Sequence, residues 1–274
     1  MGFFSVLKDL KVSMLYANQR VTQHATAGVT ELFMLALLVV LIGSVLAFLS
    51  GDYHAGFESM HPITNAVLPD AVWAWITRLG DERVVVALSL IFARRRPEIL
   101  WAMVVATIVG VAYSRGLKFY VDALRPPAVL SLDDIHLIGP TLTAHSFPSG
   151  HTLTAFLFAG VLFAFCKSWQ ERLLLMVVAV LVGVSRVALG VHWPQDVLAG
   201  AFGGLLAAGF GVWISFYWRA GLKPMVHLSL MILPLIGMVT LLLSDNGNPS
   251  TPMLVYPLVF AMACQMLLDY RSYK

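Results

Sequence analysis

Long apolar segments, separated by short polar ones, run through most of the sequence. Several reach or approach the roughly 20 residues that an α-helix needs to cross the hydrocarbon of a bilayer. Because lipid offers the backbone no hydrogen-bond partners, we expect helices and no strands. The apolar runs are Leu32–Leu49, Ile99–Val111, Thr152–Cys166, Leu173–Val184, Val197–Trp218, Val226–Leu243 and Met253–Leu268.

These runs predict an all-α fold, a polytopic transmembrane helix bundle with about eight spans. A shorter run, Val84–Ala93, reaches spanning length only if the Arg78–Arg83 region lies at the outer membrane face. We expect one membrane domain over residues 1–274, in which six helices over 29–218 form the core and 219–274 add a C-terminal pair. The expected helices cover about 30–50, 84–93 and 98–121, begin near Ser149, Arg172 and Pro194, and then cover about 226–243 and 253–268.

Two local patterns refine this picture. Residues 3–20 place apolar side chains at helical spacing, which is typical of an amphipathic helix in the membrane interface, although a poorly ordered tail is an open alternative. Gly200 and Gly204 are four residues apart in the last core helix, and this spacing allows a neighbouring helix to approach closely.

Composition supports membrane insertion and argues against nucleic-acid binding. The chain is 59% hydrophobic and 12% charged, with a mean hydropathy of +0.81. Its net charge is only +3, and no basic stripe carries interleaved aromatic residues. Cys166 and Cys264 lie in apolar runs, so we expect buried, inert thiols. The first apolar run begins late for a cleaved signal peptide, which favours a retained anchor.

The distribution of Lys and Arg predicts the orientation of the chain. If the N-terminus is cytoplasmic, most of the 18 basic residues also fall on the cytoplasmic side, as the positive-inside rule requires. The C-terminus would then be cytoplasmic as well. The basic residues left on the outer face are Arg78, Arg83, Arg115, Lys118, Arg125 and Arg186.

Three polar segments meet this outer face. In the first, Lys118 and Arg125 are seven residues apart, so we expect both side chains on one face of a helix end, where they could bind an oxyanion. Two snorkelling anchors would give the same pattern. The Arg125-Pro126-Pro127 sequence should end the helix.

The second segment is Phe147-Pro148-Ser149-Gly150-His151. Ser149 is a natural N-cap, Gly150 lets the backbone approach a ligand, and the helix N-terminus favours an anion. His151 suits proton transfer near neutral pH. A simple capping turn remains the alternative.

The third segment contains Arg186, His192 and Asp196. Asp196 follows His192 by one turn, so its carboxylate can accept from one imidazole nitrogen and leave the other free for attack. A metal site is the alternative, but no further ligands lie nearby in sequence and the neighbouring cations disfavour a divalent ion. We therefore predict no metal and no cofactor.

Taken together, Lys118-x6-Arg125-Pro126, Pro148-Ser149-Gly150-His151 and Ser185-Arg186-x5-His192-x3-Asp196 resemble the three-part signature of the type 2 phosphatidic acid phosphatase superfamily. The resemblance spans residues 30–218 and implies a phosphatase core there. It implies that His192 attacks phosphorus while Asp196 orients it, and that His151 protonates the leaving oxygen and then activates water. It also implies phosphate binding by Lys118, Arg125, Ser149, Gly150 and Arg186.

We therefore expect a hydrolase in the cytoplasmic membrane, with its site on the outer face and a phosphorylated membrane lipid as substrate. Candidate lipids are undecaprenyl pyrophosphate, phosphatidylglycerophosphate, phosphatidic acid and a lipid A phosphate. A phosphotransferase could use the same site, and a membrane transporter or flippase is the alternative from another class. The soluble haloperoxidases of the superfamily fit this chain poorly.

Four further histidines lie in the predicted loops of the outer face. We interpret His54 and His61 as solvated loop residues, not ligands, and His136 as a loop residue. His145 is also a loop residue, although its position close to Phe147-Pro148 makes it a candidate to support the site.

Overall fold

The computed structural model describes residues 3–23, 27–243, 256–257, 259–262 and 264, and in these residues every regular element is helical. The all-α prediction is therefore confirmed. The elements are α1 (Phe3–Gln23), α2 (Ala27–Ser50), α3 (Phe57–Val67), α4 (Asp70–Arg78), α5 (Glu82–Leu88), the 3-10 helix η1 (Ser89–Phe92), α6 (Pro97–Val121), α7 (Pro126–Val129), α8 (Gly150–Phe165), α9 (Trp169–Ala188), α10 (Pro194–Tyr217), the 3-10 helix η2 (Ala220–Leu222), α11 (Pro224–Leu230) and α12 (Ile232–Leu243).

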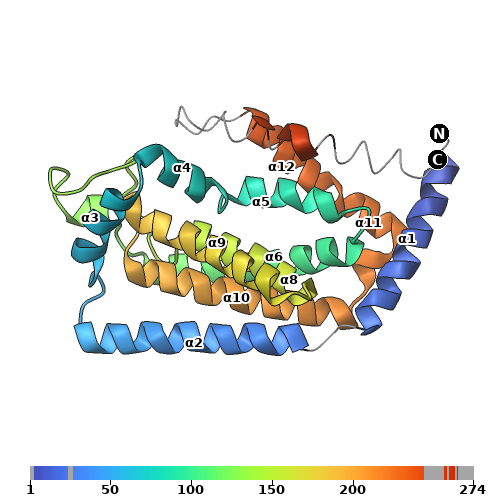
Figure 1. Ribbon diagram of the computed structural model, residues 1–274, viewed down its shortest axis with the longest axis horizontal. Coiled ribbons are helices and arrows are strands. Elements are labelled where there is room, and N and C mark those ends of the chain that lie inside the picture. The colour runs from blue at the N-terminus through green and yellow to red at the C-terminus, as the bar shows by residue number, and fades with distance from the viewer. Residues whose placement is uncertain (1–2, 24–26, 244–255, 258, 263, 265–274) are drawn as a thin grey trace.

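Helix α10 is the central element of an elongated bundle. It packs against α2, α6, α8 and α9, while α5 and α12 pair along the side opposite α2 (Figure 1). Its glycines explain the closeness of α8. A Cβ on Gly200 would lie 2.6 Å from the Ser149 carbonyl oxygen, and one on Gly204 would lie 2.5 Å from that of Leu153. The predicted small-residue contact is therefore confirmed, and it fixes α8 against α10.

Among the described residues, four helical stretches are long and apolar enough to cross a membrane: Gly28–Ser50, Pro97–Val129, Pro194–Tyr217 and Pro224–Leu243. Helix α8 is apolar but has 16 residues, and α9 has 20 residues with charged side chains at both ends. The structure supports a multi-pass membrane protein, whereas the predicted count of eight spans stays a prediction.

The expectation for Val84–Ala93 needs correction. This run is not one helix, because α5 ends at Leu88, η1 continues to Phe92, and a turn at Leu79–Asp81 separates both from α4. The three elements follow one another along the bundle (Figure 1). Arg78 and Arg83 therefore flank a break within a helical stretch.

The two ends of the chain add helices to the core. Helix α1 agrees with the predicted N-terminal helix, and its Met14 and Ala17 side chains are buried. Helix α12 packs against α5, where Leu241, Val259 and Met262 share a buried cluster. Most of the predicted helix over 253–268 lies outside the described residues.

Cys166 and Cys264 are free but partly exposed, so the prediction of buried thiols was wrong.

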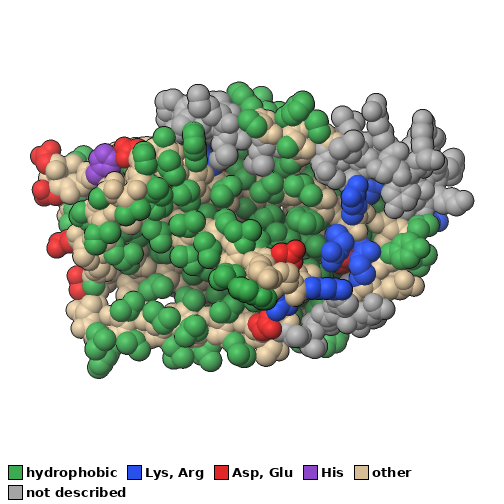
Figure 2. Space-filling model, viewed as in Figure 1, with side chains coloured by type: hydrophobic (Ala, Val, Ile, Leu, Met, Phe, Trp, Pro, Cys, Tyr) green, Lys and Arg blue, Asp and Glu red, His purple; other side chains and the backbone are tan. Residues whose placement is uncertain are grey.

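Four ends of the core helices meet at one end of the bundle. Helices α6 and α9 finish there, α8 and α10 begin there, and α3 and α4 cover them (Figure 1). Lys and Arg side chains gather at the opposite end (Figure 2). There the buried Glu98 carboxylate accepts from Arg20 at 2.7 Å and from Arg96 at 2.6 Å, while Arg172 binds Glu31 at 2.6 Å.

Replacing Gly204 with Leu should separate α8 from α10. The added side chain overlaps the α8 backbone, and overpacking of this kind costs about 1–3 kcal/mol. We expect a lower melting temperature in detergent by differential scanning fluorimetry. Gly116→Ala is the matched control, because a Cβ at Gly116 meets nothing within 4 Å. Equal melting temperatures for Gly204→Leu and the wild type would contradict this packing argument.

Candidate active site

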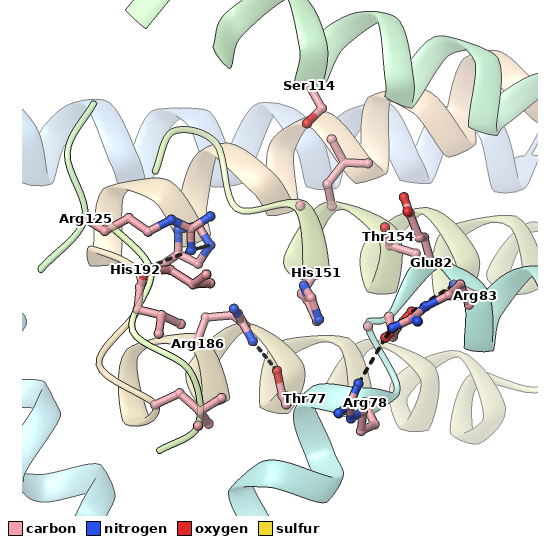
Figure 3. A pocket seen from close by; sticks show the side chains of 18 of the residues that line it. Thr77, Arg78, Glu82, Arg83, Ser114, Arg125, His151, Thr154, Arg186 and His192 are labelled. Carbon is pink, nitrogen blue, oxygen red and sulfur yellow. Dashed lines mark hydrogen bonds and ion pairs between the residues drawn. The ribbon is translucent and has the colours of Figure 1, made fainter. Parts of the chain in front are cut away.

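The three sequence motifs surround one cavity of about 780 Å³ at the end of the bundle where the four core helices meet (Figure 3). Six of the eight predicted site residues line it, and Ser149 and Asp196 lie directly behind its wall. The predicted residues on the wall are Lys118, Arg125, Gly150, His151, Arg186 and His192.

His192 and Asp196 form a buried pair. Asp196 lies in the first turn of α10, and Pro194 at the helix start fixes the backbone between the two residues. The His192 Nδ1 atom is 3.0 Å from the Asp196 Oδ2 atom, and the two side chains are 2% and 0% exposed. The predicted hydrogen bond is therefore present in the structure.

The Asp196 carboxylate receives three more hydrogen bonds. The backbone N–H of Trp193 donates to Oδ2 at 2.9 Å, and the hydroxyls of Ser146 and Tyr53 donate to Oδ2 and Oδ1. A buried carboxylate without such donors would be costly. Ser146 and Tyr53 are thus site residues that the sequence motifs did not identify, and they hold the carboxylate in place.

The other nitrogen of His192 faces the cavity. An Arg125 N–H lies 3.1 Å from Nε2, and because a guanidinium can only donate, Nε2 is the acceptor and Nδ1 carries the proton. Burial is the main cause that lowers the pKa of His192, to about 3; the hydrogen bond to Asp196 opposes the shift, while the Arg125 and Arg186 charges add to it. The imidazole is neutral near pH 7, and its Nε2 lone pair accepts the Arg125 N–H on the cavity side.

Lys118 and Arg125 reach the cavity by different routes. Lys118 lies in the last turn of α6, whereas Arg125 follows the helix end, where Asp122 has a left-handed φ of 39°. The expectation that both project from one helix face was therefore wrong. Backbone carbonyls hold both side chains: Lys118 Nζ donates to His145 at 2.6 Å, and Arg125 donates to Ala144 at 2.8 Å and to Val191 at 3.1 Å.

The Ser149–His151 segment opens α8 directly beside α10. The Ser149 N–H donates to the Asp196 carbonyl at 3.0 Å, which ties this turn to the start of α10. Ser149 is the N-cap by position, but its hydroxyl accepts from Thr152 at 2.9 Å and caps no backbone N–H. A Cβ on Gly150 would meet nothing within 4 Å, so the backbone there faces the open cavity.

Arg186 enters the cavity from the last turn of α9. Its side chain is 5% exposed, and one Nη atom donates to the Thr77 hydroxyl of α4 at 2.6 Å. Its Nε–H is buried and has no hydrogen-bond partner within the described part of the chain. An unsatisfied buried donor is costly, and an anion in the cavity is a ligand that it could bind.

The four loop histidines have different surroundings. His61 lies on α3 and is buried, where its Nδ1 contacts the Val187 carbonyl at 2.9 Å and its Nε2 accepts from the His136 N–H at 3.2 Å. The prediction that it is solvated was therefore wrong. His136 is exposed and pairs with Asp70. The His54 ring contacts the Trp193 ring in a tilted arrangement, with centroids 4.1 Å apart and an interplanar angle of 44°.

His145 supports the site through its backbone. Its φ of 53° turns the carbonyl toward Lys118 and Arg125, while its exposed imidazole pairs with Asp122 at 3.0 Å. Across the described ranges, no three His, Cys, Asp or Glu side chains cluster closely enough to share a metal ion.

Sequence comparison relates this chain to a family of known proteins. Residues 99–220 match the profile described as the PAP2 superfamily. The chain is 31% identical over 192 residues to an undecaprenyl-diphosphatase of Sulfolobus acidocaldarius, covering 67% of this chain and 87% of that protein. It is 36% identical to the bacitracin transport permease protein BcrC of Bacillus licheniformis, over 51% of this chain and 60% of BcrC, which is less than two thirds of that relative.

A solved structure shares the fold. The crystal structure of Aquifex aeolicus LpxE superposes with a TM-score of 0.51 at 28% sequence identity. The match covers 56% of this chain and 91% of that one. The shared region therefore accounts for nearly all of the smaller protein and leaves part of this chain outside it.

The lowered pKa of His192 predicts how stability depends on pH. An unfolded His has a pKa near 6.5, so lowering the pH from 6.5 to 5 protonates the unfolded chain but not the native one, and stability falls by roughly 1.5–2 kcal/mol per such residue. His192→Asn should lose less stability over this range than the wild type in detergent melts. The control is His136→Asn, which removes an exposed His. If the melting temperature of His192→Asn fell with pH as steeply as that of the wild type, the lowered pKa of His192 would be contradicted.

Proposed function

The chain belongs to the PAP2 superfamily of membrane lipid phosphatases, and from this premise we propose that it hydrolyses a lipid phosphate or diphosphate through a phosphohistidine on His192. Membership identifies a phosphoric-ester hydrolase in a multi-pass membrane protein. The observation that carries the mechanism is the orientation of His192, whose Nδ1–H is fixed by Asp196 while Nε2 faces a cavity lined by cations.

In the first step, the Nε2 lone pair of His192 attacks phosphorus. The N–P bond forms as the bond from phosphorus to the leaving oxygen breaks, and His151, which must enter this step as the imidazolium, gives that oxygen a proton. The Nδ1–H bond to Asp196 stabilises the positive charge that develops on the imidazole. Lys118, Arg125 and Arg186 bind the phosphoryl oxygens and stabilise their charge in the transition state.

In the second step, water replaces the leaving group. His151 accepts a proton from the water as its oxygen attacks phosphorus, the N–P bond breaks, and inorganic phosphate leaves. Gly150 and the first turn of α8 supply backbone N–H groups at the edge of the cavity. The protons balance over the two steps, because the His151 imidazolium gives one proton to the leaving oxygen and regains one from the attacking water.

A second cavity supports a lipid as substrate. It has a volume of about 220 Å³ and an almost wholly apolar lining from α5, α6, α8 and α12. On α6 it is lined by Val104, Thr107 and Ile108, one turn from Gly110 and Val111 of the first cavity. Because α5, α6 and α8 line both cavities, a lipid with its phosphate in the first can extend its tail toward the second.

The names of the relatives suggest the substrate class but not the lipid. An undecaprenyl-diphosphatase acts on a polyprenyl diphosphate, which supports undecaprenyl diphosphate as a candidate beside phosphatidylglycerophosphate, phosphatidic acid and lipid A. BcrC carries the name of a transport permease. The oriented His192–Asp196 pair favours hydrolysis over transport, because moving a lipid across a bilayer requires no nucleophile.

The central test is loss of phosphate release on replacing the nucleophile. His192→Ala should lower the rate on a panel of lipid phosphates by about a thousandfold or more, since groups of this kind act as a unit. Free phosphate is measured in detergent with a chelator present. His136→Ala, outside the cavity, should retain activity, and undiminished turnover in a folded His192→Ala protein would rule out the nucleophile.

We also propose that both termini are cytoplasmic and that the cavity opens on the outer face of the cytoplasmic membrane. The basic end of the bundle in Figure 2, with Arg20, Arg96 and Arg172 in ion pairs, supports this orientation through the positive-inside rule. In the same proposal, residues 29–218 form the phosphatase core and 219–274 an added helix pair within one membrane domain.

A reporter fused after Lys274 tests the orientation. A fusion to green fluorescent protein should fluoresce, and a fusion to alkaline phosphatase at the same place should be inactive, because the C-terminus is expected in the cytoplasm. As an internal control, alkaline phosphatase inserted after Asp133, in the loop beside the cavity, should be active. The opposite pattern at both positions would show that the chain is inserted in the inverse orientation.

A further inference from the structure

The turn between α4 and α5 carries a charged group that the hydrolytic steps above do not use. Arg78 and Arg83 share the carboxylate of Asp81: Arg78 Nη1 lies 3.3 Å from Oδ2, and Arg83 lies 2.7 Å from Oδ2 through Nη2 and 3.0 Å from Oδ1 through Nε. Asp81 and Arg78 are buried, at 4% and 9% exposed. All three residues lie outside residues 99–220, the part of the chain that matches the family profile.

This turn lines the same cavity as the proposed nucleophile. In Figure 3, His151 lies between the Arg125–His192 group and the Arg78–Arg83 pair. A Cβ on Gly80, in the middle of the turn, would lie 2.6 Å from the His151 carbonyl oxygen, so glycine is what allows this contact. On the other side of the cavity wall, Thr77 binds Arg186. The turn is therefore fixed against two phosphatase motifs.

The charges of the cavity exceed what one phosphoryl group requires. Lys118, Arg125 and Arg186 already surround the transferred phosphate in the proposed mechanism. The cavity wall adds three further Arg side chains and two carboxylates, which leaves a net positive charge beyond that group. These additional residues are Arg78, Arg83, Arg115, Asp81 and Glu82.

The order of groups along the cavity indicates what this charge could bind. His151 protonates the leaving oxygen, so the leaving group must extend past His151 on the side away from His192. The Arg78–Arg83 pair lies on that side in Figure 3. A leaving alcohol would bring no charge there, whereas the leaving group of a diphosphate is itself a phosphate. Arg forks recognise phosphate oxygens in pairs.

We propose that the Arg78–Asp81–Arg83 turn is the subsite for the second, non-transferred phosphate of a lipid diphosphate. This inference rests on the proposed phosphatase function and names its substrate class. Asp81 acts as a positioning residue: it holds the two guanidinium groups at the wall and compensates their charge when the cavity holds no anion. Arg83 is the less buried of the pair, with 26% of its side chain exposed, and reaches a ligand with less rearrangement.

Two substrates that share a tail isolate the effect of the second phosphate. We would compare kcat/KM for farnesyl diphosphate and farnesyl monophosphate in detergent, and follow the ratio of the two values. Arg83→Gln should lower this ratio by roughly ten- to a hundredfold, as expected for lost hydrogen bonds to a charged group. Arg219→Gln is the matched control, because Arg219 lies at the end of α10, outside the cavity lining, and its ratio should equal that of the wild type.

A purely structural role for the turn would give a different result. It would lower both kcat/KM values together and leave their ratio unchanged, and that outcome would overturn the subsite. Arg83→Lys keeps the charge but loses the fork, so its ratio should fall between those of the wild type and Arg83→Gln. A folded wild type that hydrolyses the monophosphate but not the diphosphate would leave the phosphatase function intact and refute this inference.

Binding measured without turnover tests the subsite separately from catalysis. Methylenediphosphonate, a diphosphate analogue that cannot be hydrolysed, should raise the melting temperature of the wild type more than inorganic phosphate does at equal concentration. In Arg83→Gln this difference should disappear while the phosphate effect persists. Equal shifts by the two anions in the wild type would refute the subsite, even if no lipid tested were a substrate.

Discussion

The hydrogen bond between His192 and the buried Asp196 carboxylate is the interaction on which the rest of the site depends. A carboxylate with no exposed surface needs several donors to remain ionised, and here they come from three separate parts of the chain. Tyr53 follows α2, Ser146 precedes α8, and the Trp193 N–H belongs to the start of α10. Satisfying one buried charge therefore brings these segments together around the imidazole and fixes its tautomer.

Helix packing sets the second part of the geometry. Gly200 and Gly204 let the backbone of α8 lie directly against α10, and the Ser149 N–H bonds the Asp196 carbonyl at the same contact. The first turn of α8, which carries His151, is thus placed relative to His192 by backbone contacts. Such contacts are short and leave little freedom, which suits the roles proposed for the two histidines on opposite sides of one phosphorus atom.

Local sequence patterns could predict most of the core helices and the motif residues that line the cavity, because helical periodicity, capping residues and spacing are encoded in neighbouring positions. They could not predict Tyr53, which is 143 residues from Asp196 in the chain, or Arg186 bound to Thr77, 109 residues away. Nor could they show that Arg125 leaves the α6 helix, since that depends on a left-handed turn at Asp122. Contacts set by long-range packing have no signature in a local pattern.

The cationic side chains at the two ends of the cavity have different hydrogen-bond partners. Lys118 and Arg125 donate to backbone carbonyls, neutral partners that a phosphate oxygen can replace with a stronger, charge-assisted bond. Arg78 and Arg83 share an anionic partner, Asp81. Because an unpaired buried carboxylate is strongly destabilising, both ion pairs should persist when a ligand binds. In the proposed function, the cations at one end of the cavity exchange their backbone partners for phosphate oxygens, while those at the other end bind a phosphate and keep their ion pairs with Asp81.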